Sequence, residues 1–152
     1  MKKIVIIAAM DEELEAIQNK FENVEEKKLK DLVYYEGQAK GKEYVLTKCG
    51  VGKVNSARVT QMLIDNFDIE YIMNVGIAGS LNDELEIGDI VIGKKLVQHD
   101  FDITAFGHEK GYITDTGRIF ESDDNLTKEY NKPNGEYKIL VGTIASGDIF
   151  CN

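Results

Sequence analysis

The apolar positions of this chain form short runs separated by charged or glycine-rich stretches. The first run, residues 4–7, is unbroken and β-branched, which is typical of a strand buried on both faces of a sheet. Apolar residues at helical spacing follow it and predict a helix over about residues 11–21. Residues 22–30 are of mixed charge, so we expect a solvated surface connection there.

Later runs predict more strands and two more helices. Residues 32–37 and 43–48 are close enough to pair as an antiparallel hairpin. A helix follows, in which one face carries Ser56, Val59, Met62, Leu63 and Phe67. Further strands are expected at 68–76 and 137–145, and residues 85–93 predict a turn followed by one more strand, which 94–99 could extend. A short helix is expected over 122–130. The expected organisation is one α/β domain over residues 1–152, with no helix after the last strand.

Net charge argues against some classes of binding partner. The formal net charge is −9 over 152 residues, and the lysines are mixed with glutamates rather than clustered. Extended contact with nucleic acid or an anionic membrane needs clustered cations, so we expect neither partner. A small neutral or cationic ligand fits this balance better.

Cysteine usage and the first residues favour a cytoplasmic protein. Cys49 and Cys151 lie far apart and form no metal-type or redox-type pair. The opening apolar run is too short for a signal peptide, and no apolar run could span a bilayer. The sequence predicts no metal site and no cofactor.

Three acids directly after the first strand are the main candidate for chemistry. Ala8 and Ala9 are small, and Asp11, Glu12 and Glu13 then enter the predicted helix. The end of a buried strand is a common place for a site in an α/β sheet. Acids in a first helical turn also serve as caps that suit the helix dipole, and this interpretation stays open.

Glycine-rich segments and a long loop are weaker candidates for a functional site. Gly50-Val51-Gly52-Lys53 lacks the further glycines of known phosphate-binding motifs, so a plain strand-to-helix turn is the simpler interpretation. The small residues of 76–79 would let a ligand lie against the main chain. Residues 100–124 form a loop long enough to carry function. In it, His108 is either a proton shuttle or an ordinary surface histidine.

Five segments together resemble the 5′-methylthioadenosine/S-adenosylhomocysteine nucleosidase family, within the purine nucleoside phosphorylase and uridine phosphorylase superfamily. In chain order they are Ala8-Ala9-Met10-Asp11-Glu12-Glu13, Gly50-Val51-Gly52-Lys53-Val54, Asn74-Val75-Gly76-Ile77-Ala78-Gly79, residues 99–107 (His-Asp-x-Asp-x-Thr-Ala-Phe-Gly) and Ser146-Gly147-Asp148-x-Phe150. The resemblance implies a three-layer α/β fold around a mixed central sheet. It also implies hydrolysis of the bond between adenine and a 5′-thio-substituted ribose.

The resemblance also implies roles for individual residues. Glu13 would hold and deprotonate the attacking water, while Asp11 and Glu12 would be solvated caps. The ribose and base would approach Ala9 and the Ile77-Ala78-Gly79 segment, where Ile77 stands in place of a serine of some members. Phe150 would stack on adenine, the Cys151 backbone would read the base edge, and Val51 would contact the 5′-thio group. Ile103 and Phe106 would close the 5′ pocket of the neighbouring subunit of a homodimer, and His108 stands where a tyrosine is common.

The family pattern continues beyond these motifs. It includes a Met-Glu pair that grips the ribose and a Ser-Asp pair whose Asp is the general acid, and neither pair is among these 152 residues. We therefore expect that the C-terminal third is missing and that a chain ending at Asn152 has little or no nucleosidase activity by itself.

Four alternatives remain at this stage. A nucleoside phosphorylase of the superfamily would need phosphate-binding arginines and glycines where the first loop presents acids. A futalosine-type hydrolase shares the water-activating strategy. A signalling receiver domain would need an Asp at the end of its third strand, where Lys48-Cys49-Gly50 stands instead. A non-catalytic adenosine-binding or dimerisation fragment is the fourth.

Overall fold

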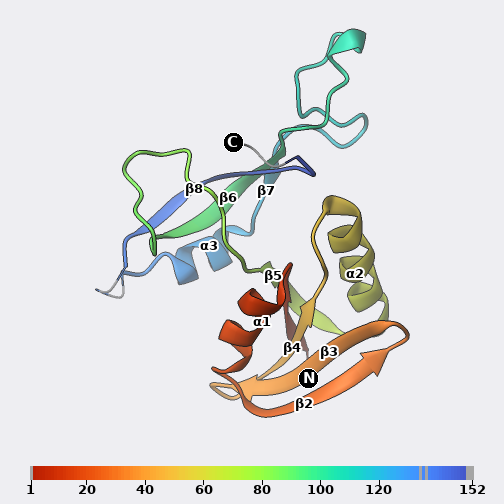
Figure 1. Ribbon diagram of the computed structural model, residues 1–152, viewed down its shortest axis with the longest axis vertical. Helices are drawn as coiled ribbons and strands as arrows, with labels where there is room; N and C mark the ends of the chain where they lie inside the picture. The colour runs from red at the N-terminus through yellow and green to blue at the C-terminus, as the bar shows by residue number, and fades with distance from the viewer. Residues whose placement is uncertain (1, 134, 136, 150–152) are drawn as a thin grey trace. The chain divides into compact units, whose positions relative to one another are not determined.

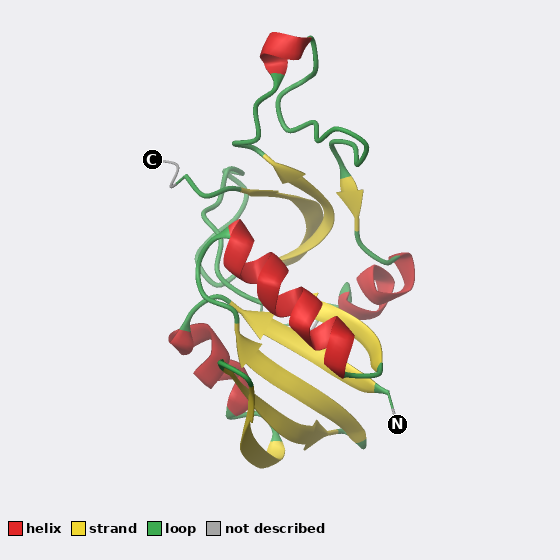
Figure 2. Cartoon of the chain, turned by 90° about the vertical axis from the view of Figure 1, so that its right-hand side faces the viewer, coloured by secondary structure: helices red, strands yellow, loops and turns green. Residues whose placement is uncertain are grey.

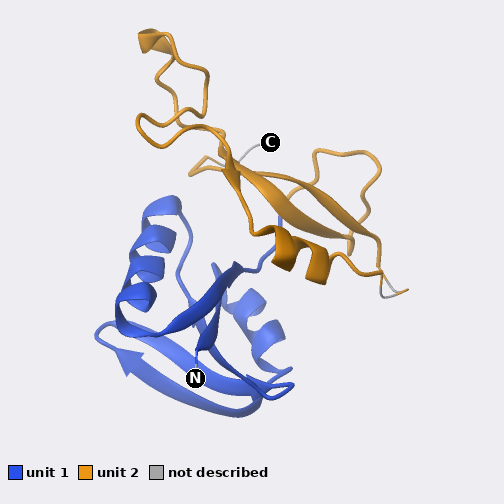
Figure 3. Ribbon diagram, turned by 180° about the vertical axis from the view of Figure 1, so that it is seen from behind, with its two compact units in different colours: residues 1–78 blue, residues 79–152 orange. Residues whose placement is uncertain are grey.

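A computed structural model of the chain describes residues 2–133, 135 and 137–149. The chain divides into two compact units, residues 1–78 and residues 79–152, which have separate colours in Figure 3. The single domain expected over residues 1–152 stays a prediction.

Both units combine helices with a sheet (Figure 1). Unit 1 contains β1 (Lys3–Ala8), α1 (Asp11–Gln18), β2 (Glu22–Leu29), β3 (Leu32–Ala39), β4 (Lys42–Lys48), α2 (Lys53–Asn66) and β5 (Ile69–Asn74). Unit 2 contains β6 (Ile90–Gln98), the 3₁₀ turn η1 (Thr104–Phe106), β7 (Phe120–Glu121), α3 (Asp124–Tyr130) and β8 (Ile139–Ser146). The predicted α/β class is confirmed.

The sheet of unit 1 is mixed, as predicted. Its strand order is β2-β3-β4-β1-β5, where β1 runs parallel to both β4 and β5, and β2, β3 and β4 are antiparallel neighbours. The predicted hairpin is therefore the β3–β4 pair, and β1 lies inside the sheet. The predicted strand at 68–76 is β5, which lies at an edge of this sheet and is only partly buried.

The core of unit 1 lies on both faces of β1, because successive side chains of a strand point to opposite faces. Val5 and Ile7 pack with Leu63 and its neighbours on α2, whereas Ile6 packs with Leu14 of α1. Figure 2 shows the long helix α2 lying across the strands, and Figure 3 shows α1 and α2 on opposite sides of them. Helix, sheet and helix thus form three layers within this unit.

The predicted first helix is three residues too long. It ends at Gln18, and Phe21 lies outside it. The Phe21 ring packs edge-on against Tyr44 of β4, with centroids 4.7 Å apart. Phe21 fits the helical spacing of apolar residues although it follows the helix. Its ring reaches the core from the segment between α1 and β2.

The surface connection predicted for residues 22–30 is wrong, because the structure has strand β2 there. It pairs antiparallel with β3 and forms the edge of the sheet. Five of its eight side chains are charged, and none is fully buried. An edge strand needs no apolar face, and lysines on it discourage pairing with other chains, so the apolar pattern that marks other strands is missing here.

Charged side chains join β1, β2 and β3 around Glu36. Its carboxylate accepts hydrogen bonds from Lys27 Nζ at 2.6 Å and from Lys3 Nζ. Burial acts to raise the pKa of Glu36, but the hydrogen bonds from Lys27 and Lys3 outweigh it and hold this pKa below its ordinary value of 4.5. The ionised carboxylate therefore stabilises the folded state above this ordinary value, and that contribution is lost as the pH falls through the lower folded pKa.

Replacing Glu36 by Gln should make unfolding less dependent on acid pH. At pH 7 we expect the variant to be less stable by about 1 kcal/mol, the upper range for a solvent-accessible ion pair. The difference from wild type should shrink towards pH 3, because wild type then loses the same interaction. Urea unfolding at both pH values measures this. The control is Glu22→Gln, an exposed change on the neighbouring edge strand β2, and an unchanged wild-type–variant difference at pH 3 would contradict the account.

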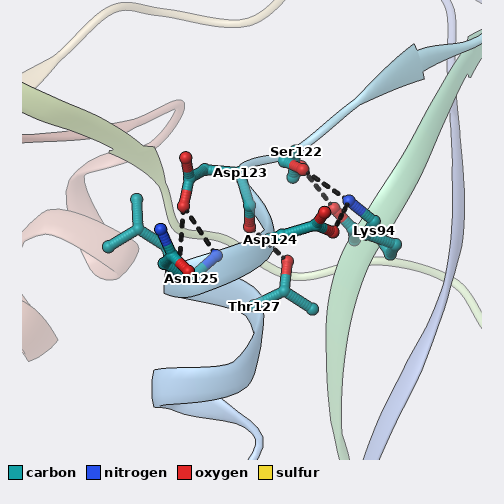
Figure 4. A network of polar contacts seen from close by, with 8 residues as sticks. Lys94, Ser122, Asp123, Asp124, Asn125 and Thr127 are labelled. Atoms are coloured by element: carbon teal, nitrogen blue, oxygen red, sulfur yellow. Dashed lines mark hydrogen bonds and ion pairs between the residues drawn. The ribbon is translucent and has the colours of Figure 1, made fainter.

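Unit 2 has a smaller sheet in the order β7-β6-β8, with β6 and β8 parallel. Helix α3 begins at Asp124, because the Asp123 side chain accepts hydrogen bonds from the next backbone N–H groups. Lys94 of β6 donates to the Ser122 carbonyl at 2.7 Å and pairs with Asp124 (Figure 4). This ion pair raises the pKa of Lys94 and lowers that of Asp124. The network fastens α3 to the sheet.

Among the described residues, no helix is long and apolar enough to cross a membrane.

Candidate active site

Three parallel strands of unit 1 end side by side. The order β4-β1-β5 places the segments that follow these strands at one edge of the sheet. The Cys49 N–H donates to the Ala8 carbonyl at 2.8 Å, and the Val75 N–H donates to the Ile7 carbonyl at 3.0 Å. Ligands of open α/β sheets bind outside the carboxyl ends of the strands, so this edge is the candidate site.

Glu13 lies at this edge, in the first turn of α1. Its Oε2 accepts hydrogen bonds from the backbone N–H of Ala9 at 2.9 Å and of Met10 at 3.0 Å. Its Oε1 accepts one from the N–H of Ile77 at 2.9 Å. The carboxylate therefore joins the turn after β1 to the segment after β5, and both predicted features, acid and small-residue run, meet in one place.

The capping interpretation of the three acids holds in part. Glu13 accepts from Met10, which is the N-cap residue of α1, so it does cap the helix. Asp11 is exposed in the first turn, as expected of a solvated cap, and it also accepts a hydrogen bond from Lys48 Nζ at 2.7 Å. Lys48 ends β4, so this pair is a second link between α1 and the sheet. Glu12 is exposed.

The Gly50-Val51-Gly52 segment turns the chain from β4 into α2. Gly52 is the N-cap residue of α2 with a φ of 101°, a conformation that favours glycine. Asn55 Nδ2 donates to the Val51 carbonyl at 2.8 Å, and the Val51 side chain is 71% exposed. The segment is thus an ordered strand-to-helix turn that presents Val51.

Cys49 is the buried residue beneath this turn. Its Sγ donates to the Gly50 carbonyl, and burial raises the pKa of the thiol, an effect to which the nearby Glu13 carboxylate adds. A thiol with a raised pKa stays protonated, so Cys49 acts as a small core residue.

In unit 2 the structure brings two of the motifs together. The Asp148 N–H donates to Asp100 Oδ2 at 2.7 Å, and the His99 N–H donates to the Ser146 carbonyl at 3.0 Å. This contact leaves no local pattern in the sequence, although both segments carry family motifs. The end of β8 is therefore fastened to the segment that follows β6.

Gly147 is packed tightly in this contact. A Cβ there would lie 2.3 Å from His99 Nε2 and 2.9 Å from Asp100 Cγ. We expect Gly147→Ala to destabilise the protein by about 1 to 3 kcal/mol, the usual cost of overpacking. Gly142→Ala on β8, where a Cβ would meet only an ordinary 3.5 Å contact, should change stability far less. Urea unfolding of both variants checks this, and an equal effect would contradict the packing argument.

The remaining predicted site residues lie in unit 2, at the boundary of the two units or outside the described residues. Ile103 and Phe106 belong to unit 2, at η1, where Phe106 is 81% exposed. Ala78 and Gly79 are exposed at the boundary of the two units. Phe150 and Cys151 lie outside the described residues.

His108 is exposed, and its ring stacks on Tyr112 with centroids 4.4 Å apart. Within the described ranges, no three His, Cys, Asp or Glu side chains gather so that they could hold a metal ion.

The chain is similar to known proteins over nearly all of its residues. The model of the family described as "Phosphorylase superfamily" matches residues 3–152. The chain belongs to the phosphorylase superfamily. The similarity predicted from the five segments is thereby confirmed, and so is the mixed α/β architecture expected for the superfamily.

Several members of the superfamily resemble the chain over nearly all of its residues. The 5′-methylthioadenosine/S-adenosylhomocysteine nucleosidase of Desulfotalea psychrophila is 41% identical over 150 residues, which are 97% of this chain and 64% of that protein. The enzyme of the same name from Staphylococcus haemolyticus is 40% identical over 151 residues, again 97% of this chain and 65% of that protein. The chain thus spans about two thirds of the length of the curated relatives it matches.

Solved structures of two enzymes align with nearly all of this chain. The nucleosidase of Streptococcus pneumoniae in complex with 8-aminoadenine aligns with a TM-score of 0.90 at 36% identity, over 99% of this chain and 65% of that one. The native futalosine hydrolase of Helicobacter pylori strain 26695 aligns with a TM-score of 0.89 at 35% identity, over 98% and 65% of the two chains.

Proposed function

We propose that the protein hydrolyses the N-glycosidic bond of 5′-methylthioadenosine and S-adenosylhomocysteine, releasing adenine and the 5′-thioribose. The observation that carries the proposal is the Glu13 carboxylate, which three backbone N–H groups hold at the carboxyl ends of β1 and β5. The similarity to nucleosidases of this substrate class supports it.

The proposed reaction needs a base for water and an acid for adenine, because water is a poor nucleophile and adenine a poor leaving group. The bond from C1′ to N9 breaks through an oxocarbenium-like transition state while an acid protonates N7 of the base. The water oxygen bonds to C1′, and Glu13 takes the water proton. A carboxylate held by the backbone keeps its position during this transfer, which favours the reactive geometry.

The other predicted site residues have roles in binding. The ribose and base would lie against the Ala9 and Ile77-Ala78-Gly79 segments, with Val51 at the 5′-thio group. Phe150 would stack on adenine, and the Cys151 backbone would read its edge. Ile103 and Phe106 would close the 5′ pocket of the neighbouring subunit.

The acidic side chains at this edge of the sheet disfavour phosphate as the nucleophile. Asp11, Glu12 and Glu13 all lie there, and a phosphate dianion near them would be repelled. Lys48, the cation at the end of β4, is already paired with Asp11. This charge distribution favours hydrolysis over phosphorolysis.

Futalosine is a second candidate substrate, because the Helicobacter pylori futalosine hydrolase resembles this chain as closely as the nucleosidase structures do. The test is adenine or base release by the full-length gene product from 5′-methylthioadenosine, S-adenosylhomocysteine and futalosine in parallel. The proposal expects the two 5′-thioadenosines to be preferred, and base release from futalosine alone would replace it by the second candidate. Calorimetry that finds 5′-methylthioadenosine bound but not cleaved would instead favour a non-catalytic adenosine-binding protein.

The proposal extends to the pathway, the cellular compartment and the oligomeric state. We place the reaction in methionine salvage and the methyl cycle of the cytoplasm, with the protein as a homodimer and without a cofactor, a nucleic-acid partner or a membrane partner. Light scattering coupled to gel filtration tests the dimer, and a monomer at micromolar concentration would refute it.

A further inference from the structure

Gly76 lies directly against the Glu13 carboxylate. It follows β5, and a Cβ built on it would lie 2.7 Å from Glu13 Oε1, 3.1 Å from Cδ and 3.4 Å from Oε2. A Cβ 2.7 Å from an oxygen is far inside van der Waals contact. The carboxylate therefore occupies the space that any side chain at position 76 would need.

The hydrogen bonds distinguish the two carboxylate oxygens. A carboxylate has about four acceptor positions, two on each oxygen. Oε2 uses both of its positions for the N–H groups of Ala9 and Met10. Oε1 uses one, for the N–H of Ile77. The remaining position belongs to Oε1, the oxygen that lies against Gly76.

We infer that Gly76 is a positioning residue for Glu13, and that Oε1 is the oxygen that takes the attacking water. Without a side chain at position 76, the carboxylate can settle on the main chain after β5, where the Ile77 N–H holds it. A methyl group at position 76 pushes Oε1 away from the Ile77 N–H. The remaining acceptor position of Oε1 then no longer points at the attacking water. The inference rests on the proposed hydrolysis for its catalytic part, and its structural part stands independently.

The kinetic test is Gly76→Ala in the full-length protein. We expect kcat for adenine release from 5′-methylthioadenosine to fall about 100-fold, the effect of displacing a reactive group by about 1 Å. KM should stay within about twofold, since binding groups are untouched. The matched control is Gly142→Ala, which also adds one methyl group but meets only Val91 Cγ1 at 3.5 Å, and it should leave kcat unchanged.

A double variant separates positioning from general damage. In a Glu13→Gln background the base is already lost, so adding Gly76→Ala should cost no more than about a further twofold. An equal loss of kcat in both backgrounds would overturn the inference, because Gly76 would then act through something other than Glu13.

Backbone amide hydrogen exchange gives a readout that needs no activity. We expect the N–H groups of Ala9, Met10 and Ile77 to exchange about tenfold faster in Gly76→Ala, and at the wild-type rate in Gly142→Ala. Unchanged exchange at all three would overturn the inference. If the wild-type protein released no adenine, the proposed function would fail, whereas these exchange rates would still decide the role of Gly76.

If Gly76→Ala does not fold, removing the opposing side chain should rescue it. The double variant Glu13→Ala, Gly76→Ala leaves room for the added methyl group, so we expect it to regain the wild-type circular dichroism spectrum. A double variant that stays unfolded would contradict the inferred contact.

Discussion

Glu13→Gln is expected to slow adenine release from 5′-methylthioadenosine about 1,000-fold at saturating substrate, within the range that a general base contributes. The glutamine side chain has nearly the same shape but cannot take a proton from water. It also presents an NH₂ group in place of one of the two accepting oxygens, so at least one of the hydrogen bonds from Ala9, Met10 and Ile77 must break. Steady-state adenine release by the full-length protein measures the effect.

The control for this prediction is the neighbouring Glu12→Gln. Glu12 is exposed and precedes Glu13 in the same helical turn, so this change removes the same charge from the same helix end. We expect kcat within about twofold of wild type. Equal losses for both variants would mean that the helix end needs negative charge rather than a base at position 13.

Leu63→Ala is expected to lower the free energy of unfolding by about 3 kcal/mol, the typical cost of a cavity at a buried leucine. Leu63 is fully buried in the cluster that joins α2 to Val5 and Ile7 of β1. Because β1 carries the turn that leads to Glu13, loss of this packing also loosens the support of the site. Urea unfolding of the full-length protein measures the change.

The adjacent residue provides the matched control. Ile64 is 51% exposed on the same helix, so Ile64→Ala deletes a similar apolar group without opening a buried cavity. We expect less than about 1 kcal/mol for it. Similar values for the two variants would contradict the assignment of the face of α2 that packs on the sheet.

Much of unit 1 could be predicted because its core strands carry continuous apolar runs. Residues 4–7 form the centre of β1, which is buried on both faces, and Val59 and Leu63 are the buried residues of α2. Strand β2 could not be predicted in the same way. Its side chains face water on an edge, so its pairing with β3 leaves no apolar pattern in the sequence.

Only part of the site could be predicted from the sequence, because some of its contacts also leave no local pattern. The family resemblance singled out Glu13, but its partner Ile77 lies 64 residues away, and no local pattern reports a contact over that distance. The small residues after β5 indicate a place where a ligand could lie against the main chain. We expected a ligand there, and the structure places the Glu13 carboxylate in that position.

The ion pair of Asp11 with Lys48 follows the same principle. From the sequence alone, an acid at the first position of a helix indicates a cap. Its ion pair with Lys48 depends on the parallel order of β4 and β1, which brings the end of β4 beside the start of α1. Tertiary contacts of this kind become visible only once the sheet order is known.

The most direct test of the central claim is the identity of the sugar that leaves with adenine. The full-length protein is incubated with 5′-methylthioadenosine, with and without inorganic phosphate, and the sugar product is identified by mass spectrometry. Hydrolysis by a Glu13-bound water predicts free 5-methylthioribose at a rate that does not depend on phosphate. A 5-methylthioribose 1-phosphate product, formed only when phosphate is present, would contradict it.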